Sequence, residues 1–379
     1  MKHVPATFGV FLLAAAVSAR VHAQQAVPAD PSPAEAPQDA AVDLDSVIVT
    51  GTRTPKAIDR IAGAISVVSK EEIKQTLAVT EDATAVLART VPGYAESSQA
   101  MSNSGETLRG RIALRLFDGV PQGSPLREGG RNATFTDMGI VGRIEVINGP
   151  SASEGIGAAG GIINYLSAVP ERDGNEFRLL TRYSTQFKDD SSGWKVGLNY
   201  MRKQDNYDLV VGASVIDRGM AYDADGRRVG MNTSGSVSDS VANNLFLKGG
   251  INFGEDGVQR LQASYSQFKI EGNGDYIQVE GCRPGTCANP VTNTSERGQI
   301  FGSKAEFNDF EQFNALYTHG DFLGGTLLLN AYWADQAMRY LPENGDDRQL
   351  VWPLPVGAER IFDQSEINSK KYGFRPSWT

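Results

Sequence analysis

Three glycines with a phosphate-binding spacing are the residues of this chain that most directly suggest chemistry. Gly155, Gly157 and Gly160 match the pattern G-x-G-x-x-G, which cradles a dinucleotide when a strand precedes it and a helix follows it. Residues 143–147 fit the strand, but residues 162–166 read as a second strand where the helix is needed. A glycine-rich run between two strands predicts instead a tight turn whose glycines permit positive φ and close packing.

Reactive side chains are few. Of the three histidines, His3 and His22 fall in an expected signal peptide, which leaves His319 in the mature chain. Zinc sites built on several histidines and catalysis by a histidine base are therefore disfavoured, and the sequence predicts no metal site, no cofactor and no enzyme activity. Cys282 and Cys287 flank a Pro-Gly turn and favour a local disulfide in an oxidising compartment.

The N-terminus indicates export. Residues 1–23 join a weakly positive start, a short apolar core and a small-x-Ala cleavage pattern, as in a secretory signal peptide; a buried helix is the alternative. Residues 24–44 are rich in Ala, Pro and acidic residues and predict a disordered tether. No later run approaches the roughly 18 apolar residues of a transmembrane helix, so membrane residence would require a β-barrel or an anchor. The net charge of −9 is spread along the chain, which argues against nucleic acid as a partner.

Two regions differ in the periodicity of their apolar residues. Residues 56–170 mix short strands with helical pieces that begin near Ser69 and near residue 81, and they predict a compact α+β domain. Residues 171–379 alternate with period two, as in Trp194, Val196 and Leu198, so each strand has one apolar face. Short turns there alternate with long polar stretches, at about residues 219–243, 272–308 and 342–365. This sorting favours an outer-membrane barrel over a soluble β-sandwich.

From about residue 45 to its end, the chain resembles the TonB-dependent outer-membrane receptors. The order and spacing of several motifs carry the resemblance, and the glycine-rich run lies among them. These motifs are DSVIVTG at 45–51, TRTP at 52–55, LRG at 108–110, LFDGVP at 116–121, VGRIEVI at 141–147, GP at 149–150 and GGIIN at 160–164.

The resemblance implies an α+β plug domain inside a transmembrane antiparallel β-barrel of the bacterial outer membrane. Residues 45–55 would be the TonB box and linker, 56–170 the plug, and 171–379 the N-terminal part of the barrel. The last region supplies about eight of the roughly 22 strands that a plugged barrel needs. We therefore expect the barrel to be incomplete in this chain, as in a fragment, a truncated gene product or an incomplete gene model. Such a half-barrel would expose its edges and should not fold stably alone.

The resemblance also implies where TonB binds and how the plug is held. The TonB-binding residues would add a strand to a sheet edge of TonB, although an ordinary first strand of the plug is the alternative. They are Asp45, Ser46, Val47, Ile48, Val49 and Thr50. Arg109 and Arg143 match the family's paired plug arginines, which face barrel glutamates and would lock the plug to the barrel. Solvated charges at strand ends are the alternative for these two residues.

Ligand is expected at the outward loops of the plug, at about residues 94–104 and 122–134. The candidate ligand-binding residues are Tyr94, Gln99, Arg127 and Arg131. Arginines there would suit an anionic ferric chelate, because positive charge in a lumen attracts anions. A solvated loop is the alternative.

The function that the sequence favours is TonB-dependent active uptake of a scarce solute, with a ferric siderophore as the first choice. Its partners would be TonB with the inner-membrane energising complex, the ferric chelate and outer-membrane lipid. The alternatives are a receptor for cobalamin, haem or oligosaccharide, a truncated fragment that does not transport, and a secreted β-rich adhesin or enzyme. A single mature histidine argues against histidine-based haem capture.

Overall fold

The chain divides into two compact units, residues 1–43 and 44–379, and all the residues that the structure describes belong to the second. The structure is a computed structural model. Among the residues it describes, no helix has the length and apolar character needed to cross a membrane. It describes residues 48–49, 56–57, 64–80, 82–97, 100–123, 131–133, 137–151, 157–231, 236–279, 281–282, 285, 287–299, 302–345 and 361–379.

A small α+β layer, here called the plug, lies between residues 64 and 167. Its central sheet has five strands in the order β3-β10-β11-β7-β8, antiparallel except for the parallel pair β11 and β7. The strands are β3 (Ile65–Val68), β7 (Ala113–Phe117), β8 (Val120–Pro121), β10 (Val141–Asn148) and β11 (Gly161–Ser167). Short pairs lie outside this sheet, namely β4 (Tyr94–Ala95) with β6 (Thr107–Leu108) and β5 (Ser102–Ser104) with β9 (Arg131–Ala133).

Two helices of the plug begin at strong N-terminal caps. Helix α1 (Lys70–Leu77) starts with a capping box, in which Ser69 and Glu72 satisfy each other's backbone N–H groups. Helix α2 (Ala83–Thr90) starts at Asp82, whose side chain accepts a hydrogen bond from the backbone of Thr84. The apolar residues of these helices pack with the central sheet in one core, which includes Ile73, Val86, Leu87, Ile144 and Ile163.

The glycine-rich run connects strands β10 and β11, as the sequence predicts. Gly149, Gly157 and Gly161 all have positive φ. A Cβ on Gly160 would lie 2.6 Å from the carbonyl oxygen of Arg111, which is too close for a side chain. A Cβ on Gly161 would clash still more severely with the carbonyl oxygen of Ile147. These glycines are therefore required by backbone geometry and close packing. Gly155 lies outside the described residues.

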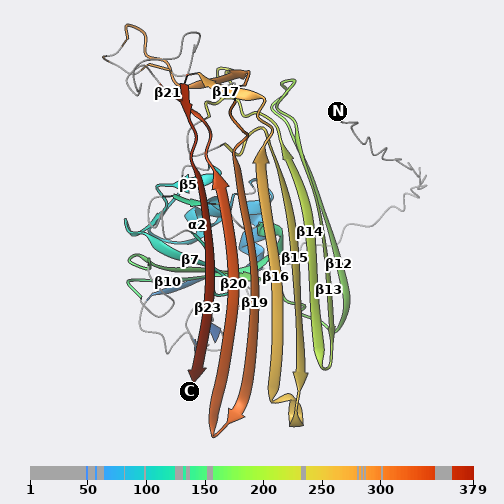
Figure 1. The fold of residues 1–379 in the computed structure, drawn as a ribbon. Coiled ribbons are helices and arrows are strands. Elements are labelled where there is room, and N and C mark those ends of the chain that lie inside the picture. The colour runs from blue at the N-terminus through green and yellow to red at the C-terminus, as the bar shows by residue number, and fades with distance from the viewer. Residues whose placement is uncertain are drawn as a thin grey trace, which may run out of the picture. The chain divides into compact units, whose positions relative to one another are not determined.

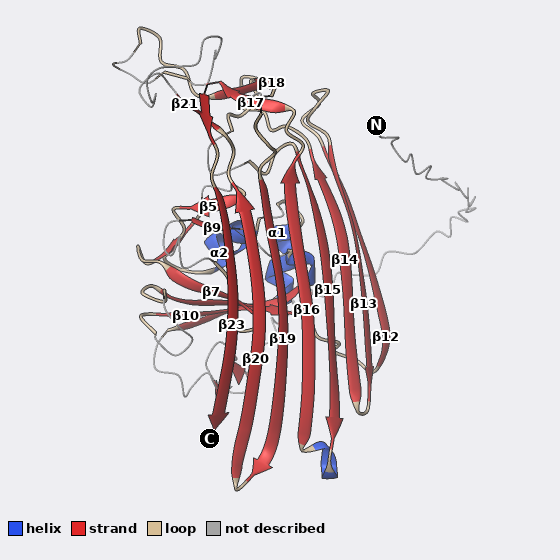
Figure 2. Cartoon of the chain, in the orientation of Figure 1, coloured by secondary structure: helices blue, strands red, loops and turns tan. Residues whose placement is uncertain are grey.

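The second layer, here called the wall, is one antiparallel sheet of eight strands in sequential order. Figure 1 shows its long strands side by side, and Figure 2 shows that the plug contributes nearly all the helix. Its strands are β12 (Gly174–Ser184), β13 (Gly193–Gln204), β14 (Tyr207–Arg218), β15 (Ser240–Phe253), β16 (Gln259–Gly272), β19 (Phe307–Phe322), β20 (Gly325–Arg339) and β23 (Glu366–Trp378). Within the described residues, β12 and β23 are the two edges, so the sheet is open.

The connections of the wall sort by length as the sequence predicts. One end carries short turns, including the short 3-10 helix η5 (Glu255–Gly257), and the other carries long loops. Two small strand pairs lie in those long loops, above the wall in Figure 1. They are β17 (Tyr276–Val279) with β18 (Thr294–Arg297), and β21 (Glu343–Gly345) with β22 (Ile361–Asp363).

The two faces of the wall differ in polarity. On β13, Trp194, Val196 and Leu198 are exposed on the outer face, while Lys195 and Met201 are buried on the inner face. The inner face packs against the plug, since Met201, Val210 and Phe246 of the wall belong to the same core as the plug residues. An apolar outer face and a filled inner face are typical of a plugged membrane barrel, and the predicted fold class is thereby confirmed.

Candidate functional site: the contact between plug and wall

A buried ion pair between plug and wall is centred on Asp137. This residue caps the short 3-10 helix η4 (Met138–Ile140), and its Oδ1 accepts a hydrogen bond from the Gly139 N–H at 2.9 Å. The same oxygen lies 2.9 Å from Nζ of Lys195 on β13, and Oδ2 accepts from the Ser214 hydroxyl on β14 at 2.5 Å. Both charged side chains are almost fully buried, at 5% and 4% exposure. The plug is thus joined to two adjacent wall strands through one carboxylate.

The charge state of Asp137 follows from these neighbours. Burial acts to raise the pKa of its carboxyl group, but the positive charge of Lys195 and the hydrogen bonds from Ser214, Gly139 and Lys195 lower that pKa below its usual value. Asp137 is therefore ionised at neutral pH, and the contact is a true ion pair.

A second buried ion pair lies at the turn between β7 and β8. Asp118, with φ of 47°, accepts hydrogen bonds from the Ser167 N–H at 2.9 Å and from the Ser167 hydroxyl at 2.7 Å. Nζ of Lys248 on β15 donates to the Ser167 hydroxyl at 2.8 Å and lies 3.8 Å from Asp118 Oδ2. This group connects the last strand of the plug, its β7–β8 turn and the wall.

The remaining wall contacts are made to the main chain of the plug. Amide and cationic side chains on β13, β19 and β23 donate to plug carbonyl oxygens over 3.0–3.3 Å. The donor and acceptor pairs are Asn199 with Gly139, Asn308 with Met101, Gln312 with Phe117, Asn314 with Asp118, Lys371 with Pro121 and with Gly123, and Arg375 with Gly119. Most of these acceptors lie in or beside the β7–β8 hairpin, so that hairpin is held along its length.

The two arginines expected to lock the plug to the wall lie on or beside strands of the plug. Arg143 donates to Glu145 of its own strand β10 at 2.8 Å, and Glu145 is fully buried. Arg109 is exposed between β6 and β7, with φ of 53°. The ion pairs described between plug and wall come from Asp137 with Lys195 and from Asp118 with Lys248, which the sequence analysis had not singled out. The lock formed by Arg109 and Arg143 stays a prediction.

Of the four candidate ligand residues, only Tyr94 has a described side chain. Its hydroxyl donates to Glu106 at 2.7 Å, and Glu106 in turn lies 3.2 Å from the guanidinium of buried Arg115. Burial, followed by the charges of Tyr165 and Glu106, raises the pKa of Tyr94. Arg131 lies on β9, opposite Ser104 of β5. Gln99 and Arg127 lie outside the described residues, so the ligand site stays a prediction.

The expected TonB-binding segment is partly described. Ile48 and Val49 form strand β1, which pairs antiparallel with β2 (Lys56–Ala57). Asp45, Ser46, Val47 and Thr50 lie outside the described residues, as do the expected signal peptide and tether. The backbone of Ile48 and Val49 is thus in the extended conformation that strand addition to a partner requires.

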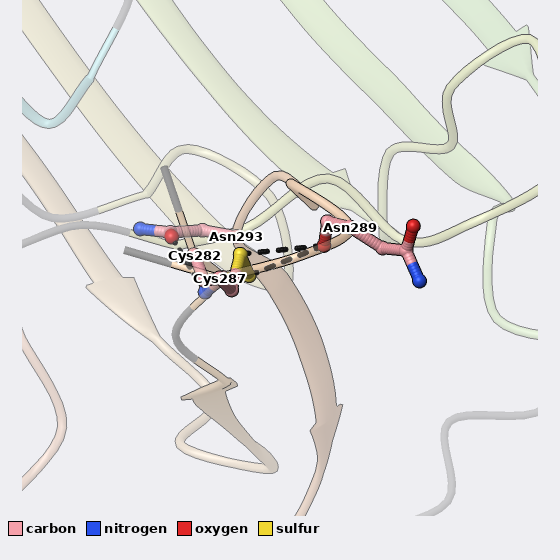
Figure 3. Close-up of a disulfide and its surroundings, with 5 residues drawn as sticks. Cys282, Cys287, Asn289 and Asn293 are labelled. Carbon is pink, nitrogen blue, oxygen red and sulfur yellow. Dashed lines mark hydrogen bonds between the residues drawn. A yellow bond between two sulfur atoms is a disulfide. The ribbon is translucent and has the colours of Figure 1, made fainter. Parts of the chain in front are cut away.

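Cys282 and Cys287 are joined in a disulfide in the long loop between β17 and β18 (Figure 3), with their Cα atoms 6.0 Å apart. Both sulfur atoms lie 3.3 Å from the carbonyl oxygen of Asn289. No group of three or more metal-ligating side chains occurs among the described residues. This part of the loop is therefore a cross-linked turn at the long-loop end of the wall.

Residues 57–162 match the family model of the TonB-dependent Receptor Plug Domain. Among curated relatives, the rhizobactin receptor of Rhizobium meliloti (strain 1021) is 25% identical over 87% of this chain and 44% of its own length. The ferric aerobactin receptor of Klebsiella pneumoniae is 24% identical over 88% of this chain and 44% of its own length. A hemin receptor of Yersinia enterocolitica is 28% identical over 59% of this chain and 31% of its own length.

Solved structures show the same fold. The siderophore receptor PirA from Acinetobacter baumannii superposes with a TM-score of 0.56 at 17% identity, over 82% of this chain and 44% of that one. The FrpB iron transporter from Neisseria meningitidis gives 0.54 at 18% identity, over 82% and 45%. Residues 57–162 are thus assigned to the plug domain of the TonB-dependent receptors, the chain shares the fold of the solved structures, and the predicted resemblance is confirmed. The chain spans less than half the length of these relatives.

Proposed function

We propose that this chain is part of a receptor that takes up a ferric siderophore across the bacterial outer membrane, with energy delivered through TonB. The observation that carries the proposal is how the plug is held. Hydrogen bonds and two buried ion pairs join it to the wall, beside an apolar contact of Phe117 with Phe246 at 5.8 Å between ring centroids. When the plug moves, its polar groups can form hydrogen bonds with water in place of those with the wall, so the net free energy needed to break each contact is small. A plug held in this way stays in place at rest but can be displaced by an applied force.

The choice of a ferric siderophore rests on the relatives. Two of them are named as rhizobactin and ferric aerobactin receptors, and two matching structures are a siderophore receptor and an iron transporter. A hemin receptor is also similar. Among the described residues the one histidine is His319, near the short-turn end of β19 and away from the long loops. That position supports a siderophore over haem capture by histidine.

Uptake measurements test this function. Cells carrying the full receptor that contains this chain are starved of iron and offered a panel of radiolabelled ferric siderophores. We expect deletion of the gene to abolish uptake of at least one of them, and a protonophore to have the same effect. Unchanged uptake of every ferric siderophore after deletion would overturn the proposal, and a loss of haem uptake alone would favour the haem alternative.

Site-directed crosslinking tests the TonB contact. A cysteine at Val49, on β1, should crosslink to a cysteine in the periplasmic part of TonB in energised cells. Ser238→Cys is the matched control, because Ser238 lies in the long loop between β14 and β15, away from the short-turn end of the wall. Equal crosslinking from both positions, or none from Val49, would contradict a TonB box at residues 45–50.

A further inference from the structure

A cavity of about 490 Å³ separates part of the plug from the short-turn half of the wall. The plug lines it with residues of β10, β11 and the β7–β8 turn, and the wall lines it with β15, β16, β19, β20 and β23. The lining residue Leu328 is near the start of β20, and Arg375 is near the end of β23. Both positions are close to the short-turn end of the wall. The cavity therefore lies on the side of the plug that faces away from the long loops. Its volume is in the range of small-molecule sites.

One buried hydrogen-bond donor in this cavity lacks an acceptor. Asn164 on β11 is 1% exposed, and its Oδ1 accepts from the Gly119 N–H at 3.1 Å. Its Nδ2 has no hydrogen-bond partner within the part of the chain that the structure describes. A buried amide group left without an acceptor is destabilising. The cavity therefore favours a ligand that brings an oxygen acceptor to Asn164.

The charges around the cavity favour an anion. Four cationic side chains line it, from Lys70, Arg143, Lys248 and Arg375, together with the two carboxylates Asp118 and Glu171. Arg143 also pairs with the buried carboxylate of Glu145, so four cations stand against three carboxylates. Glu171 is 63% exposed and pairs with Lys70 at 2.6 Å, so water screens much of its charge. Lys248 is only 7% exposed, and Arg375 donates to the neutral carbonyl of Gly119. Positive charge thus exceeds negative charge in a space with low-dielectric walls, which attracts anions.

We propose that this cavity is a binding subsite for the carboxylate groups of the transported ligand on the short-turn side of the plug. Asn164 and Arg375 supply donors from opposite sides of the cavity, and Lys248 supplies positive charge. The subsite receives the ligand after it has passed the outward loops and before it leaves the lumen. The role in transport rests on the proposed function, whereas the presence of an anion site does not.

Binding of a simple tricarboxylate tests the site directly. The full receptor that contains this chain is purified in detergent and titrated calorimetrically with citrate and with the neutral ester triethyl citrate. We expect citrate to bind and the ester not to bind. Asn164→Asp keeps the oxygen that accepts from the Gly119 N–H and replaces the Nδ2 donor by a second carboxylate oxygen. This oxygen repels the carboxylates of citrate, so the substitution should weaken citrate binding at least tenfold. Lys269→Gln removes a positive charge outside the cavity and should leave the affinity within twofold.

A second variant shows whether a loss of citrate binding by Asn164→Asp reflects the cavity or a failure of that variant to fold. Arg375→Gln removes a cation from the opposite side of the cavity and should also weaken citrate binding at least tenfold, while its circular dichroism spectrum shows the same strand content as that of the natural protein. Equal binding of citrate and its ester, or binding by both variants as tight as in the natural protein, would overturn the anion site.

Uptake by the same variants separates the two proposals. Asn164→Asp should bind the ferric chelate from outside with unchanged affinity but transport it more slowly. Transport at the natural rate after loss of citrate binding would overturn the role of the subsite in uptake. If the natural receptor binds citrate as expected but takes up no ferric siderophore, the proposed function fails and the anion site stands.

Discussion

At the scale of single residues, Asp137 has two tasks that depend on the same carboxylate. It caps a 3-10 helix of the plug and it pairs with Lys195 of the wall. Breaking a buried ion pair by removing one charge leaves the other buried and uncompensated, which costs about 3–5 kcal/mol. The strength of the plug's attachment therefore depends strongly on this one residue.

Substituting Asp137→Asn tests that dependence. Asparagine retains an acceptor for the helix cap, but it leaves the charge of Lys195 uncompensated, so we expect a loss of about 3–5 kcal/mol in the free energy of unfolding. Denaturant unfolding of the purified receptor measures it. Lys203→Met is the control, because Lys203 and Asp173 form an exposed pair at 3.9 Å, and its loss should cost less than about 1 kcal/mol. Equal effects of the two changes would refute the assigned role of Asp137.

Glu306 predicts a dependence of stability on pH. This residue precedes β19 in the long-loop region and is 1% exposed. Chiefly burial, with the nearby charges of Asp239 and Glu271, raises its pKa to about 7, although the backbone N–H groups of Ser236 and Glu306 act to lower it. The unfolded chain has the lower pKa, so it releases the proton first. The contribution of Glu306 to stability is therefore fully present below about pH 4.5 and is lost as the pH rises through about 7.

Comparison with Glu306→Gln isolates this contribution. The variant stays neutral at every pH, so it should match the natural protein at pH 4 and exceed its unfolding free energy at pH 8 by an amount on the order of 3 kcal/mol. The control is Glu296→Gln, since Glu296 is exposed on β18. If Glu306→Gln gave the same pH profile as the natural protein, Glu306 would not be the titrating group.

At the scale of elements, one carboxylate connects three long loops. Asp190, between β12 and β13, accepts hydrogen bonds from the hydroxyls of Tyr222 and Tyr276 and from Arg228 Nε at 2.9 Å. Tyr222 and Arg228 belong to the loop between β14 and β15, and Tyr276 begins β17. The guanidinium of Arg228 also lies 5.3 Å from the ring centroid of Tyr276. The long loops are therefore expected to move together.

Hydrogen exchange can show whether they do. We expect Asp190→Ala to increase amide exchange in residues 219–231 and 276–279 at least tenfold, while the wall strands keep their protection. Asp223→Ala is the control, because the hydrogen bonds of Asp223 stay within one loop; it should affect residues 222–228 alone. Faster exchange confined to the loop of Asp190 would show that the three loops are independent.

Much of this element structure could be predicted from the sequence. The capping pattern at Ser69 correctly predicted α1, and period-two alternation correctly predicted strands such as β13 and β15. Periodicity assigns a side chain to a face but does not show what lies opposite it. Lys195 and Lys248 alternate with the exposed apolar residues of β13 and β15 and so belong to the inner face, but the sequence pattern does not identify Asp137 and Asp118 as their partners. Both aspartates lie in short turns with no repeating pattern, and only the tertiary fold brings them to the wall.

At the scale of the whole molecule, the outer face of the wall should be in contact with lipid. Leu198 lies outward near the middle of β13 and is 49% exposed. An arginine at mid-membrane on such a face costs about 2–4 kcal/mol, so Leu198→Arg should lower stability by that amount and reduce the receptor found in outer-membrane fractions. Leu198→Ala, which stays apolar, is the control. Equal stability of the arginine and alanine variants in lipid would show that this face is not embedded.

Several wall side chains recognise the plug through carbonyl oxygens at Met101, Phe117, Gly119 and Pro121. Every amino acid has that carbonyl, so these four contacts depend on the path of the plug's main chain and not on the identity of its residues, unlike the ion pairs of Asp137 and Asp118. Substitutions in the β7–β8 hairpin other than at Asp118 can therefore change the side chains that the plug exposes while these hydrogen bonds to the wall are kept. Selectivity and retention are therefore separable properties, and evolution can vary the first while the second is inherited unchanged.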